Sequence, residues 1–182
     1  MRQVKGVLFL DYVRMLKAHK SGGWIEELPP ADRPYLDMKI DPAGWYPMET
    51  FERMGNAILK YVAGGELLPV RLWGRFSAAQ MRTVNPMLLA PGDPVDTLHR
   101  FKVMRATFFD FAALDILMLH AGEAQIEIRY HMGMPAEEAA ATQTLGFFEG
   151  LLELAGAKSI DARFREKSWE NHERTVLALR WS

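Results

Sequence analysis

The fold class is decided by one stretch of sequence, which runs Leu114-Asp115-Ile116-Leu117-Met118-Leu119-His120, Ala121-Gly122-Glu123 and Gln125-Ile126-Glu127-Ile128-Arg129-Tyr130. Its last part alternates apolar with polar residues, which is typical of a strand with one buried face. Its first part is an apolar run of strand length, and Gly122 marks a turn between the two parts. The stretch therefore predicts a β-hairpin.

A second hairpin is expected at the end of the chain. Two further runs alternate in the same way: Ile160, Ala162 and Phe164 with Asp161, Arg163 and Arg165, then Val176, Ala178 and Arg180 with Leu177, Leu179 and Trp181. Between the hairpins, Pro135 begins and Gly156 ends a segment with helical period. Residues 106–182 are therefore predicted to form a four-stranded antiparallel sheet with one helix across it.

Residues 1–105 have the apolar period of helices instead. We expect one helix around Leu8 to His19 that Ser21-Gly22-Gly23 ends, one from Pro47 to Gly64-Gly65, one after Pro69, and one that Asp93-Pro94 begins. The proline-rich residues 29–44 are expected to form a loop with short turns. The fold class is thus α+β: a single domain over residues 1–182, in which an N-terminal helical bundle (1–105) packs on the sheet-and-helix half (106–182).

Composition excludes several classes of protein. The 182 residues contain 22 Lys+Arg against 23 Asp+Glu, a formal net charge of −1 with no basic cluster, so nucleic acid is not an expected partner. There are no cysteines, which excludes disulfides, thiolate metal sites and cysteine nucleophiles and is usual in a reducing cytoplasm. No apolar run reaches about 18 residues, so no membrane span is expected. We therefore expect a cytoplasmic domain of ordinary globular composition.

Sequence motifs for catalysis are absent. The chain has no Walker loop, no G-x-G-x-x-G after a strand, no G-x-S-x-G and no H-E-x-x-H. Asp110 and Asp115 are expected at a strand edge or in a turn, in preference to forming an acid–base pair. Glu137-Glu138 stand where the dipole of a helix favours acidic residues in its first turn. We expect a protein that is not an enzyme.

The histidines of the hairpin do not predict a metal site. The expected turn is centred at Gly122-Glu123, and this register places His120 opposite Gln125. It places His131 opposite Leu114, several residues away along the ladder. The two imidazoles would therefore not meet on one metal ion.

Aromatic and methionine side chains are the most suggestive feature of the chain, which has 10 Phe, 5 Trp, 5 Tyr and 11 Met. They indicate either a large, well-filled core or a cavity between the helical half and the sheet for a flat or apolar ligand. The candidates for lining such a cavity are Trp73, Phe76, His99, Phe101, Met104, Tyr130, Met132, Met134, Phe147 and Phe148. Of these, His99 is expected to be partly buried with a hydrogen-bond partner. Gly146 and Gly150 are expected to let the helix pack closely on the sheet, or to let backbone approach a ligand.

The order of several motifs resembles that of the haem-nitric oxide/oxygen binding (H-NOX) domains, over the whole chain. Lys5-Gly6-Val7-Leu8-Phe9 is similar to the family's opening K-G-x-x-F, Trp45-Tyr46-Pro47-Met48-Glu49 to its Y-P-D-E-E, Leu72-Trp73-Gly74-Arg75 to its F-G-R, and Leu145-Gly146-Phe147-Phe148-Glu149-Gly150-Leu151-Leu152 to its glycine-rich helix. Leu98-His99 falls at the position of the family's iron-ligating histidine. The closing stretch, which ends Leu177-Ala178-Leu179-Arg180-Trp181, is also similar to a family of about this size in myxobacteria, which implies a bacterial protein.

The resemblance departs from the family at the haem site. In H-NOX domains a Y-x-S-x-R motif holds the haem propionates, and the matching segment here is Tyr130-His131-Met132-Gly133-Met134. The tyrosine remains, while Met132 and Met134 occupy the serine and arginine positions. Two buried propionates would then be poorly paired, at a cost of several kcal/mol, unless Arg129 or Arg105 substitutes. Haem is therefore a possible cofactor that the sequence does not favour.

Three functions remain open. The favoured one is a non-enzymatic sensory or signalling domain that binds a small apolar or flat ligand and is read by a signalling protein partner; the resemblance extends to V4R-type domains, which bind small molecules without haem. The first alternative is a haem-based sensor of NO or O2 with His99 as axial ligand, in which NO strains or breaks the iron–histidine bond. The second is a ligand-free protein-interaction module with a filled core and an exposed apolar patch. A homodimer is possible, but no heptad pattern or outward apolar stripe marks its interface.

Overall fold

The computed structural model describes residues 1–19 and 23–182. Its helices are α1 (Gly6–Ala18), α2 (Trp24–Glu27), α3 (Pro34–Asp37), α4 (Met48–Ala57), α5 (Leu67–Val84), α6 (Pro94–Met104) and α7 (Ala136–Leu154). Its strands are β1 (Gln3–Lys5), β2 (Trp45–Pro47), β3 (Leu114–His120), β4 (Glu123–Ile128), β5 (Asp161–Glu166) and β6 (Thr175–Arg180). Single 3-10 turns cover Pro86–Leu88, Arg105–Thr107 and Ser168–Glu170, and one π-helical turn covers Ile58–Val62.

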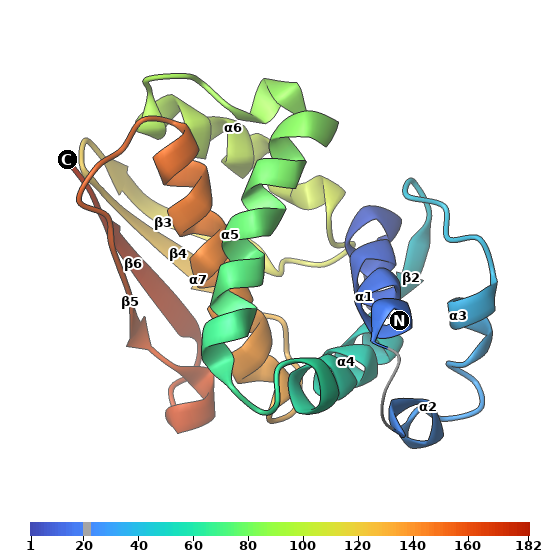
Figure 1. The fold of residues 1–182 in the computed structure, drawn as a ribbon. Coiled ribbons are helices and arrows are strands. Elements are labelled where there is room, and N and C mark those ends of the chain that lie inside the picture. The colour runs from blue at the N-terminus through green and yellow to red at the C-terminus, as the bar shows by residue number, and fades with distance from the viewer. Residues whose placement is uncertain (20–22) are drawn as a thin grey trace.

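The C-terminal half is an antiparallel sheet with strand order β3-β4-β6-β5, and α7 lies across one face of it (Figure 1). Ala124, Ile126 and Ile128 alternate along β4 as its buried residues. The α+β fold class and the four-stranded sheet with a crossing helix are therefore confirmed. The alternation of apolar residues in the sequence predicts the buried face of β4, because successive side chains of a strand point to opposite sides of the sheet.

The register of the first hairpin differs from the expected one. His120 pairs with Glu123 and Leu114 with Ile128, so the turn is the two-residue connection Ala121-Gly122. Gly122 adopts a φ of 80°, a left-handed conformation that glycine reaches without a Cβ penalty. The predicted pairing of His120 with Gln125 and of His131 with Leu114 is wrong, because the turn closes one residue earlier and an irregularity follows between Ile116 and Met118.

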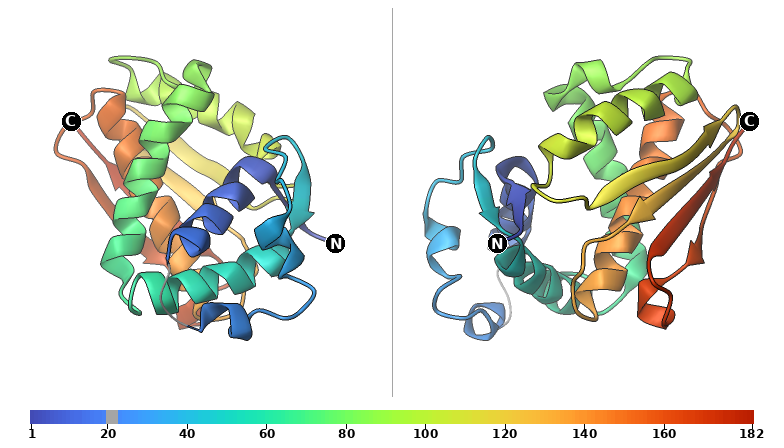
Figure 2. Two further views of the ribbon diagram at one scale, coloured as in Figure 1. Left: turned by 45° about the vertical axis from the view of Figure 1, so that its right-hand side comes forward. Right: turned by 180° about the vertical axis from the view of Figure 1, so that it is seen from behind.

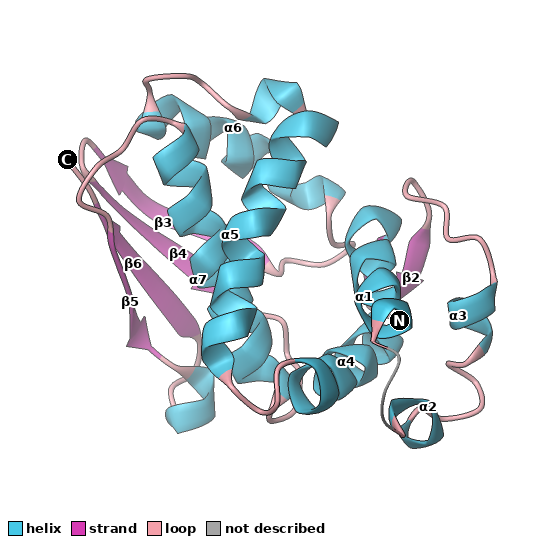
Figure 3. Cartoon of the chain, viewed as in Figure 1, coloured by secondary structure: helices cyan, strands magenta, loops and turns pink. Residues whose placement is uncertain are grey.

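Helices α5 and α7 cross in close contact, and glycines make this possible. A Cβ added at Gly74 of α5 would overlap the carbonyl oxygen of Gln143, and one at Gly146 of α7 would overlap that of Arg71. The expectation that the glycines of α7 pack against the sheet is thus wrong. They face α5, which runs beside α7 (Figure 3).

Several helix ends are where the sequence places them. The Asp93 side chain accepts a hydrogen bond from the N–H of Asp96 (2.8 Å) and caps α6. Gly64 and Gly65 follow the π-helical turn at φ 64° and 81°, and Gly156 follows α7 at φ 95°. Of the expected stop Ser21-Gly22-Gly23, the first two residues lie outside the described part of the chain.

The N-terminal half contains a small sheet that the helical period did not predict. β1 pairs antiparallel with β2, with Val4 opposite Tyr46. Pro47 is therefore the last residue of β2 and precedes α4, instead of standing in the first turn of a helix. α5 likewise begins at Leu67, two residues before Pro69.

The N-terminal elements α1 to α4 and β1–β2 form a group beside the α5–α7 pair and the sheet, and α4 connects the two by packing on α7 (Figures 1 and 2). Phe9 anchors this group, with its ring stacked on Tyr46 at 4.7 Å and edge-on to Tyr35 at 5.3 Å. The space between α1 and the α5–α7 pair is where the candidate site lies.

Helix α5 also carries an outward apolar stripe, so the expectation that no such stripe is present is wrong. Leu68, Leu72 and Phe76 follow one another at intervals of four residues and are 66%, 55% and 62% exposed. Over the described residues, no helix has both the length and the apolar character needed to cross a membrane.

Candidate functional site

A cavity of about 350 Å³ lies between α1 on one side and α5 and α7 on the other. The segment that connects α6 to β3 and the residues that follow β4 complete its wall. These segments are far apart in the sequence, so the cavity exists only in the folded chain. Its volume falls within the range of small-molecule sites in proteins, about 300–1,000 Å³.

Aromatic rings make up much of the wall. Phe101 from α6 meets Phe148 from α7 edge-to-face with ring centroids 4.8 Å apart, and Phe147 lies 5.9 Å away. Phe108 and Phe109 extend this surface from the segment that follows α6. This part of the wall is aromatic and apolar, which suits a flat or apolar ligand.

One end of the cavity is polar and buried. Tyr130 and Thr144 share a hydrogen bond of 2.6 Å between their hydroxyls, and Tyr12 donates one of 2.9 Å to the Oε1 atom of Gln143. Both tyrosines are more than nine-tenths buried. Burial raises the pKa of the Tyr12 phenol and of the Tyr130 phenol well above the usual value, so both stay protonated at neutral pH.

The opposite end of the cavity opens to solvent between α1 and the second half of α5. Arg14, Gln80 and Val84 line this mouth and are exposed. Arg14 has a side chain that is 69% exposed, and its guanidinium lies 3.8 Å from the carboxylate of Asp11. Charge is therefore present at the rim, whereas the buried polar groups of the wall are hydroxyls and an amide.

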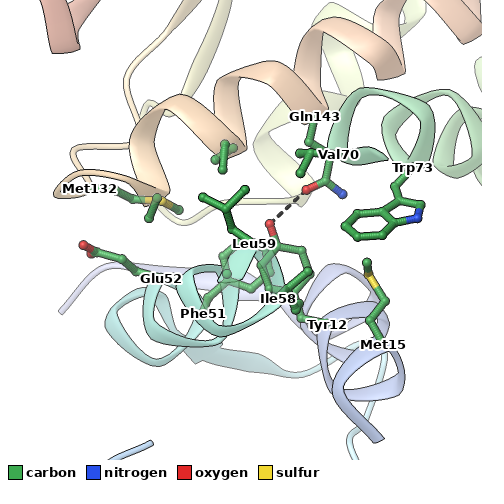
Figure 4. A pocket seen from close by; sticks show the side chains of 14 residues that line it. Tyr12, Met15, Phe51, Glu52, Ile58, Leu59, Val70, Trp73, Met132 and Gln143 are labelled. Carbon is green, nitrogen blue, oxygen red and sulfur yellow. Dashed lines mark hydrogen bonds between the residues drawn. The ribbon is translucent and has the colours of Figure 1, made fainter. Parts of the chain in front are cut away.

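A smaller space of about 20 Å³ lies on the other side of the Tyr12–Gln143 hydrogen bond (Figure 4). Tyr12, Phe51, Met132 and Gln143 line both spaces. In Figure 4 the amide nitrogen of Gln143 points toward Trp73, while its oxygen faces Tyr12. The hydrogen-bonded pair is thus a partition, with the large cavity on one side and a space the size of about one water molecule on the other.

Half of the predicted pocket residues line the large cavity: Phe101, Tyr130, Met132, Phe147 and Phe148.

The other half lie elsewhere. Trp73 lines the smaller space. Met104 is half-buried against the core. Phe76 and Met134 are 62% and 56% exposed. His99 is exposed on α6, where its neighbour Leu98 is fully buried, so the expectation that His99 is partly buried is wrong.

Several lining residues had no signal in the sequence. Tyr12, Ser77, Gln143 and Thr144 are isolated polar or amphipathic residues within helices. Their side chains meet only because α1, α5 and α7 converge in space. A polar residue on the otherwise apolar face of a helix was the single clue, and it is a weak one.

The loop that carries Met132 into the wall is fixed by a buried carboxylate. Glu137, only 6% exposed at the start of α7, accepts a hydrogen bond of 2.8 Å from the N–H of Met132. Burial raises the pKa of the Glu137 carboxyl above its usual value. A further hollow of about 250 Å³, lined by Met132, Glu137, Trp169 and Arg174 among others, adjoins this loop.

No group of three or more His, Cys, Asp or Glu side chains within the described residues is arranged to hold a metal ion. His120 lies at the hairpin turn, and His131 follows β4 at a φ of 55°.

Comparison with solved structures gives matches over nearly the whole chain. An unliganded Fe(II) H-NOX protein mutant from K. algicida is 13% identical, with a TM-score of 0.69, and the match covers 98% of this chain and 96% of that one. An H-NOX protein from S. oneidensis in the Fe(II)NO state is 11% identical, with a TM-score of 0.63 and coverage of 98% and 99%. An oxygen-binding H-NOX domain related to soluble guanylate cyclases is 13% identical, with a TM-score of 0.63 and coverage of 98% and 95%.

The chain has an H-NOX-like fold. No protein-family model matches the sequence, and no curated protein is similar to it in sequence. At 11–14% identity the likeness concerns the fold. What the cavity of this H-NOX-like fold holds has to be judged from its own residues.

The described residues of the cavity wall do not fit a haem group. No histidine is among them, and His99 points to solvent. Arg105 is paired with Asp115 (3.1 Å) and Arg129 with Glu127 (2.9 Å), and neither guanidinium lines the cavity. The wall therefore provides neither an imidazole for iron nor a buried guanidinium for propionates.

Proposed function

We propose that this chain is a haem-free, non-enzymatic sensory domain that binds a small, flat or apolar ligand in the cavity between α1 and the α5–α7 pair. The observation that carries the proposal is the cavity itself, with a volume of about 350 Å³, an aromatic wall and one buried polar end. Its location is proposed to be cytoplasmic. The haem-free V4R-type domains to which the resemblance extends use a related fold in this way.

The volume sets the size of the ligand. An apolar protein cavity of about 150 Å³ is large enough for benzene. A cavity of about 350 Å³ with stacked aromatic walls therefore suits a compound of two fused rings better than a single ring. Apolar surface removed from water supplies the main part of the binding energy.

The position of the cavity also supplies a signalling mechanism. A ligand there contacts α1 on one side and α7 on the other, and these helices belong to the two groups of elements that α4 connects. Binding would favour one packing of α1 against the α5–α7 pair over others. A protein partner that contacts α1 or α5 would detect the change.

Naphthalene is the probe that tests the cavity. We expect it to raise the melting temperature of the protein, because it binds the folded state alone. The variant Ser77→Phe, which places a ring in the cavity, should abolish this effect. Ala79→Phe is the matched control, since Ala79 lies on the same helix, is also half-buried and does not line the cavity. Equal naphthalene stabilisation in both variants would contradict the proposal.

The haem-based alternative is tested by a visible absorption spectrum of the protein before and after stoichiometric hemin. The proposal predicts no sharp Soret band and the same weak, nonspecific titration for the native chain and for His99→Ala. A sharp Soret band that His99→Ala removes would establish the gas-sensor function instead.

The apolar stripe Leu68, Leu72 and Phe76 favours a second candidate function, binding of a protein partner or of a second copy at α5. The substitution of Leu72 and Phe76 by Ser should then leave naphthalene binding unchanged. Sedimentation of the native chain over a range of concentrations separates the homodimer from a heterologous partner.

A further inference from the structure

The hydrogen atoms at the polar end of the cavity can be assigned from the geometry. Thr144 donates its hydroxyl hydrogen to the carbonyl oxygen of Ala140 (2.9 Å), one turn earlier in α7. The 2.6 Å bond between Tyr130 and Thr144 must therefore use the hydrogen of Tyr130. The Tyr130 oxygen is left with acceptor capacity and no hydrogen to donate.

The hydroxyl of Tyr12 likewise has no hydrogen left to donate to a ligand. Its hydroxyl hydrogen is donated to Oε1 of Gln143 at 2.9 Å, so its oxygen also presents only lone pairs. Figure 4 places the amide nitrogen of Gln143, which is a donor, on the far side of this bond, toward Trp73. Tyr12 and Tyr130 both line the large cavity.

The surroundings of these oxygens disfavour charge on a ligand. Phe51, Phe109 and Met132 are the neighbouring wall residues, and they are apolar. The guanidinium in the wall, that of Arg14, lies at the mouth and is 69% exposed. A carboxylate carried to the polar end would lose its hydration and meet two acceptor oxygens, which is strongly unfavourable.

We infer that the cavity selects a neutral two-ring ligand that carries one hydrogen-bond donor, of the naphthol or indole class, and that this donor binds the hydroxyl oxygen of Tyr130. The inference rests on the proposed function, since it assumes that the cavity is a ligand site. It adds the chemical class of the ligand and the residues that select it. A ligand that lacks the donor leaves the free lone pair of the buried Tyr130 oxygen without a partner, which is how a hydrogen-bonding site discriminates between analogues.

The experiment compares four compounds of similar shape by calorimetric titration of the native protein: 2-naphthol, 2-methoxynaphthalene, naphthalene and 2-naphthoate. We expect 2-naphthol to bind about tenfold more tightly than 2-methoxynaphthalene or naphthalene, and 2-naphthoate to bind more weakly than all three. Equal affinity for 2-naphthol and 2-methoxynaphthalene, or a preference for 2-naphthoate, would overturn the inference and leave the cavity function in place. Failure of all four compounds to bind would overturn the proposed function itself.

Variants then identify the acceptor. Tyr130→Phe should reduce the preference for 2-naphthol over naphthalene by about threefold or more, with little change in the affinity for naphthalene. Tyr35→Phe is the matched control, because Tyr35 is half-buried in the same molecule and does not line the cavity. An unchanged preference in Tyr130→Phe would overturn the assignment to this oxygen. If Tyr130→Phe does not fold, the comparison of the four compounds on the native chain still decides the inference.

Discussion

The hydroxyl of Tyr12 donates a hydrogen bond of 2.9 Å to the side-chain oxygen of Gln143, 131 residues later in the chain. It joins α1 to α7 and separates the large cavity from the small space beside Trp73. The Tyr12 ring is held in place by Phe51, on which it stacks with centroids 4.0 Å apart and planes inclined by 12°. This contact joins the N-terminal elements to α7 in addition to the packing of α4 on α7.

Removing the Tyr12 hydroxyl should weaken the contact between α1 and α7 and lower the stability of the fold. We expect Tyr12→Phe to lower the free energy of unfolding by about 1 kcal/mol, because a partly buried amide oxygen loses its partner while ring packing is retained. Urea denaturation followed by circular dichroism measures the effect. Tyr35→Phe should change stability by less than about 0.5 kcal/mol, and an equal loss in both variants would argue against a special role for the Tyr12–Gln143 bond.

The close crossing of α5 and α7 should not tolerate a methyl group. In Gly74→Ala and Gly146→Ala the new Cβ overlaps a backbone carbonyl oxygen of the facing helix, so each should cost about 3 kcal/mol or more. Gly55→Ala in α4 is the control: its Cβ would meet only the ring of Tyr12 at 3.3 Å, and alanine is a better helix former than glycine. Unfolding free energies of Gly74→Ala and Gly146→Ala close to that of Gly55→Ala would show that the two helices are further apart than described.

The ion pair between Arg71 and Glu149 lies at the same crossing, and its contribution to stability is expected to require both residues. Glu149 is only 4% exposed and receives two hydrogen bonds from Arg71, one of them 2.9 Å long. Arg71→Met leaves a buried carboxylate without this partner and should cost about 2 kcal/mol. The double variant Arg71→Met/Glu149→Met should recover part of that loss.

A double-mutant cycle in urea measures this coupling. Glu153→Met serves as the control, since Glu153 is 60% exposed and its ion pair with Arg75 should contribute less than about 0.5 kcal/mol. Additive losses in the Arg71 and Glu149 variants would refute the coupling.

Part of the loss of folding stability at acid pH should come from Asp32. Burial by itself would raise the pKa of this carboxyl, but hydrogen bonds from Arg53 and Thr50 outweigh burial and hold the pKa below its ordinary value of 3.8. A lowered pKa in the folded state means that ionised Asp32 stabilises the fold above pH 3.8, and that this contribution is lost as the pH falls through the folded-state pKa.

We therefore expect Asp32→Asn to lower stability by about 2 kcal/mol at pH 7, and the difference from the native chain to shrink as the pH falls below 4. Chemical denaturation at pH 7, 5 and 3 tests this. Asp37→Asn, at an exposed position nearby, is the control. A difference between Asp32→Asn and the native chain that does not change with pH would contradict the assignment.

The alternation in β4 and the cap at Asp93 were predictable because both depend on neighbours in the sequence. Whether a strand has one apolar face, and whether a side chain can accept from the N–H three residues later, is settled within a few residues. The same holds for the helix ends at Gly64 and Gly156, where glycine permits a positive φ.

The pairing of β1 with β2 and the register of the first hairpin were not predictable in this way. β1 has three residues and pairs with a segment some forty residues away, so its alternation is too short to detect. The turn of the first hairpin is one residue shorter than expected, and this changes the pairing register. Residues 114–120 are almost all apolar, so their pattern fits either register.

The amino-acid sequence was sufficient for the α+β class and for the main helices and strands, and it left open whether the many aromatic residues fill a core or line a cavity. That Leu98 is buried and His99 exposed depends on tertiary packing, because neighbouring residues of a helix point about 100° apart and the face that α6 turns to the core is set by the elements it packs against. Only the tertiary structure placed Tyr12, Tyr130, Gln143 and Thr144 at one end of one cavity. Local sequence determines which face of a helix or strand is apolar. Which other element packs on that face is determined by contacts between segments that are distant in the chain.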